Sequence, residues 1–320
     1  MYRNKTKAIK SNSIHISSPI KEDELYVGVD RLKVGFALEP IRGLPLDTII
    51  YLLKKTLLEH FEFNWRIMPR IDRVIKNLGR TTTTFHLPIF PRDNFDFSSV
   101  DVDSAYEVQM KETIDFVNHW KKDLNLRYVL AHCPEDPNGN YELMFERLSE
   151  IETPLVLENV VGQTDEHFMN FYFQAKDYLG KKIAGHALDI SHRYVNDWKT
   201  WLDIPKELEK EIVYIHISDC SKTEDLHLPL GLGEMPFNEF FTYLKKIRYR
   251  GVIMQELKPN GNQTEELMAS GMYCMKPFSK WNYNRMVFRR AILRMILKRR
   301  KKEFVEVADK TAEEIGFDWA

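Results

Sequence analysis

The chain has 320 residues, of which 43% are hydrophobic and 29% are charged, a composition typical of globular proteins rather than of fibrous or low-complexity ones. Its formal net charge is −1, so the chain as a whole carries no positive field that would attract polyanions. No apolar run reaches the roughly 18 residues that a membrane span needs. The three cysteines have no paired spacing, and the polar N-terminus has no signal-peptide core, so we expect a cytoplasmic protein with free thiols and no membrane partner.

Strand-like and helix-like segments alternate along most of the chain. Short β-branched and apolar runs predict eight strands, over residues 33–38, 61–68, 81–87, 127–132, 154–158, 183–190, 212–217 and 251–256. Helical periodicity predicts helices between them, over residues 46–60, 71–78, 103–123, 141–151, 165–178, 206–211 and 236–247. Eight such units in a chain of this length favour an α/β fold, a closed (β/α)8 TIM barrel.

Three regions are expected. Residues 1–30 are mixed and polar and form an N-terminal arm, residues 31–275 form the catalytic barrel, and residues 276–320 form a basic C-terminal helical extension. In this extension Arg290, Arg294 and Lys298 are four residues apart and produce a basic stripe. A helix docked on the barrel with a solvated basic side is the favoured interpretation, and an acidic or phosphate-rich partner is the alternative.

Metal-binding side chains stand where the predicted strands end. In a βα barrel these ends meet at one mouth. Nine groups qualify: His86, His132, Glu158, Asp189, His192, His216, Asp225, His227 and Glu256. Each alone has an ordinary explanation, such as a local hydrogen bond or a buried ion pair. Asp225 and His227 are two residues apart, so that in extended chain both point the same way.

Taken together the nine groups predict a metal site. Carboxylates at the ends of apolar strands are costly to bury without a cation, and several at one mouth repel one another. Mixed nitrogen and oxygen donors suit Zn²⁺, Mn²⁺, Fe²⁺ or Co²⁺ better than Ca²⁺. We expect one to three divalent ions. A nucleotide cofactor is not expected, because no glycine-rich fingerprint directly follows a strand.

At these residues the sequence resembles the xylose-isomerase-like TIM barrels, which include sugar isomerases, sugar epimerases and class II AP endonucleases. The resemblance rests on Leu157-Glu-Asn-Val-Val-Gly-Gln163, Leu188-Asp-Ile-Ser-His192, His216-Ile-Ser-Asp219, Asp225-Leu-His227 and Gln255-Glu256. It covers residues 32–260.

The isomerase and epimerase branch implies one metal, held by the counterparts of Glu158, Asp189, His216 and Glu256. Glu158 and Glu256 would then also transfer a proton beside the substrate carbonyl, and His192 would orient the substrate. Two further residues, Lys222 and Lys258, are candidates for binding a substrate phosphate.

The nuclease branch implies three zinc ions, for which all nine groups are counterparts. Three departures weigh against it. Residues 87–89 lack the tyrosine-containing segment of those nucleases, Asp189-Ile-Ser-His192 replaces their Asp-Thr-Cys-His, and the loop between His216 and Asp225 is shorter. Near-neutral charge also disfavours a dedicated DNA binder.

We therefore expect a divalent-metal-dependent isomerase or epimerase that acts on a sugar, sugar phosphate or related polyol, with a second copy of the chain as a candidate partner in a homo-oligomer. The alternative is a two- or three-metal phosphoesterase resembling AP endonucleases, the only case in which nucleic acid is a partner. A non-catalytic barrel that assembles through the C-terminal helices ranks last, because a scaffold has no use for nine ligands at one mouth.

Overall fold

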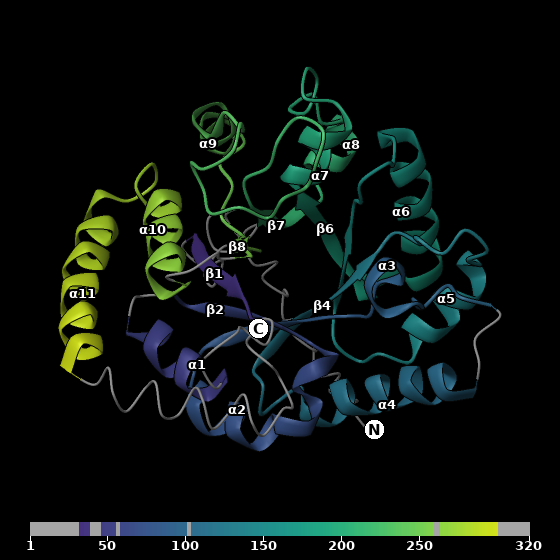
Figure 1. Cartoon of the computed structure of the whole chain (residues 1–320). Coiled ribbons are helices and arrows are strands. Elements are labelled where there is room, and N and C mark those ends of the chain that lie inside the picture. Colours follow the sequence, from purple (N-terminus) through teal and green to yellow (C-terminus); the bar gives the residue numbers. More distant parts are fainter. Residues whose placement is uncertain (1–31, 39–45, 56–57, 101–103, 259–262, 300–320) are drawn as a thin grey trace, which may run out of the picture. The chain divides into compact units, whose positions relative to one another are not determined.

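Eight parallel strands form a closed barrel in chain order, β1 to β8, in the computed structural model, which describes residues 32–38, 46–55, 58–100, 104–258 and 263–299 (Figure 1). The strands are β1 (Lys33–Ala37), β2 (His60–Asn64), β3 (Thr82–His86), β4 (Leu126–His132), β5 (Leu155–Glu158), β6 (Ile183–Asp189), β7 (Ile212–Ile217) and β8 (Val252–Gln255). The expected (β/α)8 barrel is confirmed.

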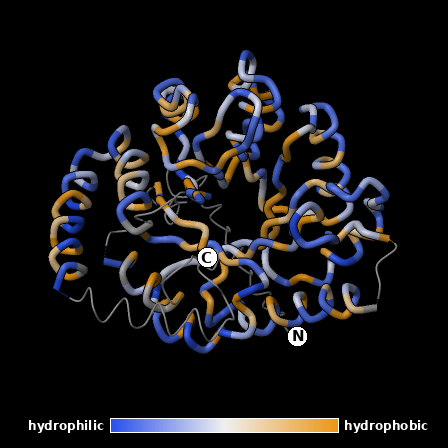
Figure 2. Tube along the Cα trace, in the orientation of Figure 1, coloured by the Kyte–Doolittle hydropathy of each residue, from blue (hydrophilic) through white to orange (hydrophobic). Residues whose placement is uncertain are grey.

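Helices connect successive strands and surround the barrel. They are α1 (Leu46–Lys54), α2 (Ile71–Leu78), α3 (Phe90–Asp93), α4 (Ser104–Trp120), α5 (Tyr141–Ser149), α6 (Asp165–Leu179), α7 (Ile190–Asn196), α8 (Lys206–Glu209), α9 (Phe237–Lys246), α10 (Gln263–Met275) and α11 (Lys280–Arg299). Figure 2 shows hydrophobic and hydrophilic residues alternating along them, as expected for helices with one face on the barrel.

The predicted boundaries around β2 were wrong. The first helix ends at Lys54 rather than at residue 60, and β2 ends at Asn64 rather than at residue 68. The Asn64 side chain accepts a hydrogen bond from the Arg66 backbone N–H and begins a 3₁₀ helix, Trp65–Arg70. The apolar residues of this 3₁₀ helix, which the sequence analysis assigned to the strand, therefore pack against the core without joining the sheet.

A short helix that the sequence analysis missed follows β6 at once. Asp189 caps α7, because its carboxylate accepts a hydrogen bond from the His192 backbone N–H at 2.8 Å. The missed helix places His192 one turn above the end of β6. The cap therefore fixes both residues at the same end of the barrel.

Strand alternation sends successive side chains to opposite sides of the barrel wall. Outward residues such as Phe61, Phe85 and Ile215 join the main core between the strands and the helices. Inward residues form a separate apolar layer, Leu130, Val156, Ala187, Tyr214, Val252 and Met254. The next inward position along several of these strands is a predicted metal ligand, so the layer forms the floor of the site.

The C-terminal helices α10 and α11 lie side by side (Figure 1). Met286 and Leu293 on α11 are buried. Arg290 and Arg294 pair with the Glu265 carboxylate on α10. Two members of the predicted basic stripe thus hold α11 against α10, whereas the favoured interpretation expected the basic side to be solvated.

Some expectations fall beyond the described residues. The N-terminal arm over residues 1–30, the start of the helix expected at residue 103 and the last part of the C-terminal extension, residues 300–320, lie outside them. None of the described helices combines the length and hydropathy needed to cross a lipid bilayer.

The close approach of β6 to β7 requires a glycine at position 185. A Cβ atom there would lie 2.4 Å from the Glu211 carbonyl oxygen and 2.8 Å from the Val213 side chain. We expect Gly185→Ala to lower the free energy of unfolding by about 1–3 kcal/mol, because backbone must move to admit the methyl group. Urea denaturation measures this loss. An unchanged urea midpoint would show that β6 and β7 can move apart without loss of stability.

Candidate metal centre

All nine predicted ligands lie among the described residues at the carboxyl-terminal mouth of the barrel. His86, His132, Glu158 and Asp189 are the last residues of β3 to β6. His216 is the penultimate residue of β7, and Glu256 directly follows β8. His192 lies in α7, and Asp225 and His227 lie in the loop after β7.

Four of these residues form a first ligand group. Glu158, Asp189, His216 and Glu256 offer ligand atoms that all lie within 4.8 Å of one another. The His216 Nδ1 atom is 2.9 Å from Glu158 Oε1, 3.4 Å from Glu256 Oε2 and 4.0 Å from Asp189 Oδ2. One imidazole nitrogen and three carboxylates are sufficient donors for one divalent ion.

A second group uses the other oxygen of Glu158. His86, His132 and Glu158 also offer ligand atoms within 4.8 Å of one another. Glu158 Oε2 lies 3.4 Å from His132 Nε2 and 3.8 Å from His86 Nε2. The two oxygens of one fully buried carboxylate thus face two different groups.

A third cluster surrounds Asp225. Its Oδ2 atom lies 3.0 Å from His227 Nε2 and 3.3 Å from His192 Nε2, and His192 Nε2 is also 3.6 Å from Asp189 Oδ2. His227 has a left-handed backbone, with φ of 48°. The extended-chain argument for Asp225 and His227 was therefore wrong, although both side chains do meet.

Hydrogen bonds outside the site orient four of the five imidazoles in the same way. The Nδ1–H groups of His86, His192 and His227 donate to backbone carbonyl oxygens at 2.7, 2.9 and 3.2 Å. His132 Nδ1 is 2.7 Å from a carboxylate oxygen of Glu135. Each Nε2 lone pair therefore points inward, which is the arrangement of histidines that bind metals.

Two carboxylate oxygens in the site accept no hydrogen bond from the described residues. They are Glu158 Oε2 and Asp225 Oδ1, both buried. An unpaired buried carboxylate oxygen is costly, and coordination of a cation removes that cost. These two atoms, together with the mixed donor set, fit divalent metal ions.

The pKa values of the metal-free cluster show how protons compensate its charge. Burial acts to lower the pKa of His132, but Glu158 and Glu135 outweigh it and raise this pKa to about 10. Burial, together with repulsion from Glu158 and Asp225, raises the pKa of Asp189 to about 6. Without metal, positively charged imidazoles and a partly protonated Asp189 balance the carboxylates.

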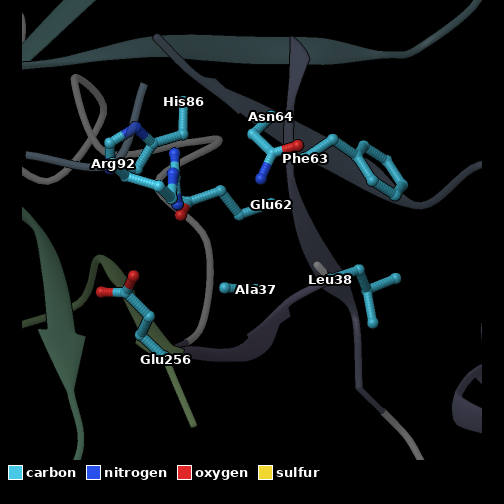
Figure 3. A pocket seen from close by; sticks show the side chains of 8 residues that line it. All are labelled: Ala37, Leu38, Glu62, Phe63, Asn64, His86, Arg92 and Glu256. Atoms are coloured by element: carbon cyan, nitrogen blue, oxygen red, sulfur yellow. The ribbon is translucent and has the colours of Figure 1, made fainter. Parts of the chain in front are cut away.

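A narrow pocket opens beside the cluster (Figure 3), with a cavity volume of about 10 Å³, which is room for about one water molecule. It is lined by Ala37, Leu38, Glu62, Phe63, Asn64, His86, Arg92 and Glu256. Arg92 places a cationic side chain beside the ligands His86 and Glu256. A positive charge therefore lies next to two of the predicted ligands.

The two predicted substrate-binding lysines are exposed. The Lys222 ammonium lies 4.5 Å from the centre of the Trp198 ring and makes no contact with the nine ligands among the described interactions. Lys258 lies closer to the nine ligands than Lys222 does. Its backbone N–H donates to the His227 carbonyl, and its positive charge acts on the His227 imidazole.

The sequence analysis did not identify Glu62, which contacts His216, or Glu135, which contacts His132. The alternation His60-Phe-Glu-Phe-Asn64, polar at every second position, was the available signal for Glu62.

Comparison with known proteins identifies the family. A family model described as "Xylose isomerase-like TIM barrel" matches residues 57–277, and the chain belongs to this family. No curated protein sequence matches the chain significantly.

Solved structures share the fold at low sequence identity. A D-tagatose 3-epimerase-like protein is 20% identical, with a TM-score of 0.58 over 77% of this chain and 97% of that one. An AP endonuclease, family 2, from Brucella melitensis is 16% identical, with a TM-score of 0.56 over 78% and 100%. A 3-keto-D-glucoside 4-epimerase from E. coli is 12% identical, with a TM-score of 0.56 over 77% and 99%. Such identities show a common fold.

Metal binding should release protons. Because the pKa of His132 is raised to about 10 and that of Asp189 to about 6, both groups hold protons that an ion must displace, Asp189 mainly below pH 6. We expect the affinity for Zn²⁺ to increase from pH 5.5 to pH 8, with net proton release. Calorimetry in buffers of different ionisation enthalpy measures this, and pH-independent binding without proton release would contradict it.

Proposed function

We propose that the chain is a multi-metal phosphoesterase that hydrolyses a small phosphate ester. The observation that carries the proposal is the position of Glu158, whose two oxygens face separate ligand groups. A carboxylate placed in this way can bridge two metal ions. Two bridged ions activate water for attack on phosphorus and stabilise the leaving oxygen.

The charge of the cluster supports more than one ion. Six carboxylates lie within 4 Å of imidazole nitrogens at this mouth: Glu62, Glu135, Glu158, Asp189, Asp225 and Glu256. One divalent ion would leave most of that negative charge uncompensated, whereas two or three ions bring it close to neutral.

The residues beside the ligands suit a phosphate ester. Arg92 lines the pocket, and its guanidinium group, which donates to the Asp93 carboxylate at 3.3 Å, has a geometry that matches phosphate oxygens. The net charge of −1 disfavours a nucleic acid as substrate, because phosphate contacts carry most of the non-specific affinity for nucleic acids.

A one-metal sugar isomerase or epimerase is the second candidate. It is supported by the first ligand group, which is complete without the other residues, and by epimerases among the similar structures. We rank it second because Glu158, its expected proton carrier, is fully buried and has both oxygens directed at imidazoles. The other five predicted ligands also lie beside carboxylates or one another rather than standing apart to bind hydroxyl groups: His86, His132, His192, Asp225 and His227.

Metal content and activity should separate the two candidates. We expect protein purified without added metal to contain two or three divalent ions per chain by elemental analysis, and to hydrolyse bis(p-nitrophenyl) phosphate or p-nitrophenyl phosphate. The double variant His86→Ala/His132→Ala should lose about one ion and at least roughly 100-fold in hydrolysis, because an ion contributes several kcal/mol to transition-state stabilisation.

The double variant keeps the first ligand group intact and therefore serves as the one-metal form. A wild-type content of one ion, with deuterium exchange from D₂O into a ketose or ketose phosphate and no phosphoester hydrolysis, would contradict the proposal and favour the isomerase.

A further inference from the structure

We propose that Glu62 is a positioning residue of the metal centre, which holds the His216 ring so that Nδ1 rather than Nε2 faces the metal. This inference rests on the metal centre of the proposed function. Glu62 is not one of the nine predicted ligands, and its role would be to act through His216.

Glu62 lies in the middle of β2, where it is the register partner of Ala37 on β1 and of Thr84 on β3. Its neighbours Phe61 and Phe63 belong to the core outside the barrel wall, so Glu62 points inward. Only 3% of its surface is exposed.

One oxygen of Glu62 receives two contacts from β7. Its Oε2 atom lies 2.9 Å from His216 Nε2 and accepts a hydrogen bond from the Tyr214 hydroxyl at 2.8 Å. Tyr214 and His216 are two residues apart on one strand, so both face the barrel interior. Tyr214 therefore holds the Glu62 carboxylate in the place where it meets the imidazole.

His216 is oriented oppositely to the other four imidazoles of the site. His86, His132, His192 and His227 bond outward through Nδ1 and present Nε2. His216 instead presents Nδ1 to Glu158 and Glu256, while its Nε2 faces Glu62. A reversed ring needs a hydrogen-bond acceptor at Nε2, and Glu62 is that acceptor.

The consequence for metal binding follows from imidazole chemistry. A neutral imidazole has one N–H group and one lone pair. When the N–H of Nε2 donates to Glu62, the lone pair is at Nδ1, directed at the first ligand group. The carboxylate also makes Nδ1 a stronger donor, as in carboxylate–histidine–metal triads.

Replacement of Glu62 by glutamine tests this role without changing side-chain size. The Gln amide can turn and donate to Nε2, which would move the proton to Nδ1 and block coordination. We expect Glu62→Gln to weaken Zn²⁺ binding roughly 10- to 100-fold in competition with a chromogenic chelator. The exposed Glu59, directly before the same strand, provides the matched control, and Glu59→Gln should bind as tightly as wild type.

A measurement on the unaltered chain tests the ring orientation directly. In ¹⁵N-histidine-labelled protein loaded with Zn²⁺, the His216 signal, assigned by its loss in His216→Gln, should show a protonated Nε2 and a coordinated Nδ1. A protonated Nδ1 with Nε2 as ligand would overturn the inference, and this result does not require that Glu62→Gln folds.

The outcomes separate the two proposals. Wild-type protein that binds no divalent metal would overturn the proposed function. Wild-type protein that binds metal, together with equal affinity in folded Glu62→Gln, would overturn the role of Glu62 alone. Equal weakening in Glu62→Gln and Glu59→Gln would also overturn it, because loss of one negative charge would then be the cause.

Discussion

The burial of carboxylates at one end of the barrel is the constraint on which the rest of the site depends. Glu158 is completely buried, and Asp189 is nearly so. A buried carboxylate is stable only beside positive charge or hydrogen-bond donors. In the protein without metal, imidazoles supply these donors and positive charges. Divalent ions would supply more positive charge. Four of the five histidines therefore have two uses, as proton carriers in the absence of metal and as ligands in its presence, whereas burial lowers the pKa of His86 and leaves it a ligand alone.

The sequence predicted the fold well because a parallel barrel leaves clear signals. Strands such as Ile212–Ile217 are short β-branched runs, and a polar residue close to the strand end, here His216, stands out against apolar neighbours. Six of the nine ligand candidates followed from strand ends, and His192, Asp225 and His227 followed from the segments directly after those ends; the structure brings the nine side chains together. The prediction failed where local hydrogen bonds decide the boundary, as at Asn64, whose side chain ends β2 and starts a 3₁₀ helix.

Other features of the site have no sequence signal. The sharing of Glu158 between two groups depends on side-chain torsions, and the choice of Nδ1 or Nε2 depends on partners far away in the chain. Glu62 and His216 are separated by 154 residues. The excess of ligands is visible in the sequence, but the carboxylate oxygens that face each ligand are not, and the proposal of multi-metal chemistry depends on those oxygens.

The apolar layer formed by Leu130, Val156, Tyr214, Met254 and their neighbours closes the barrel directly beneath the ligands. Ions therefore have no route through the barrel axis and must enter and leave by the mouth. A substrate seated at that mouth would lie across the same route. A bound substrate would then slow metal exchange, so a chelator should remove metal faster from the substrate-free protein than from the substrate-bound protein.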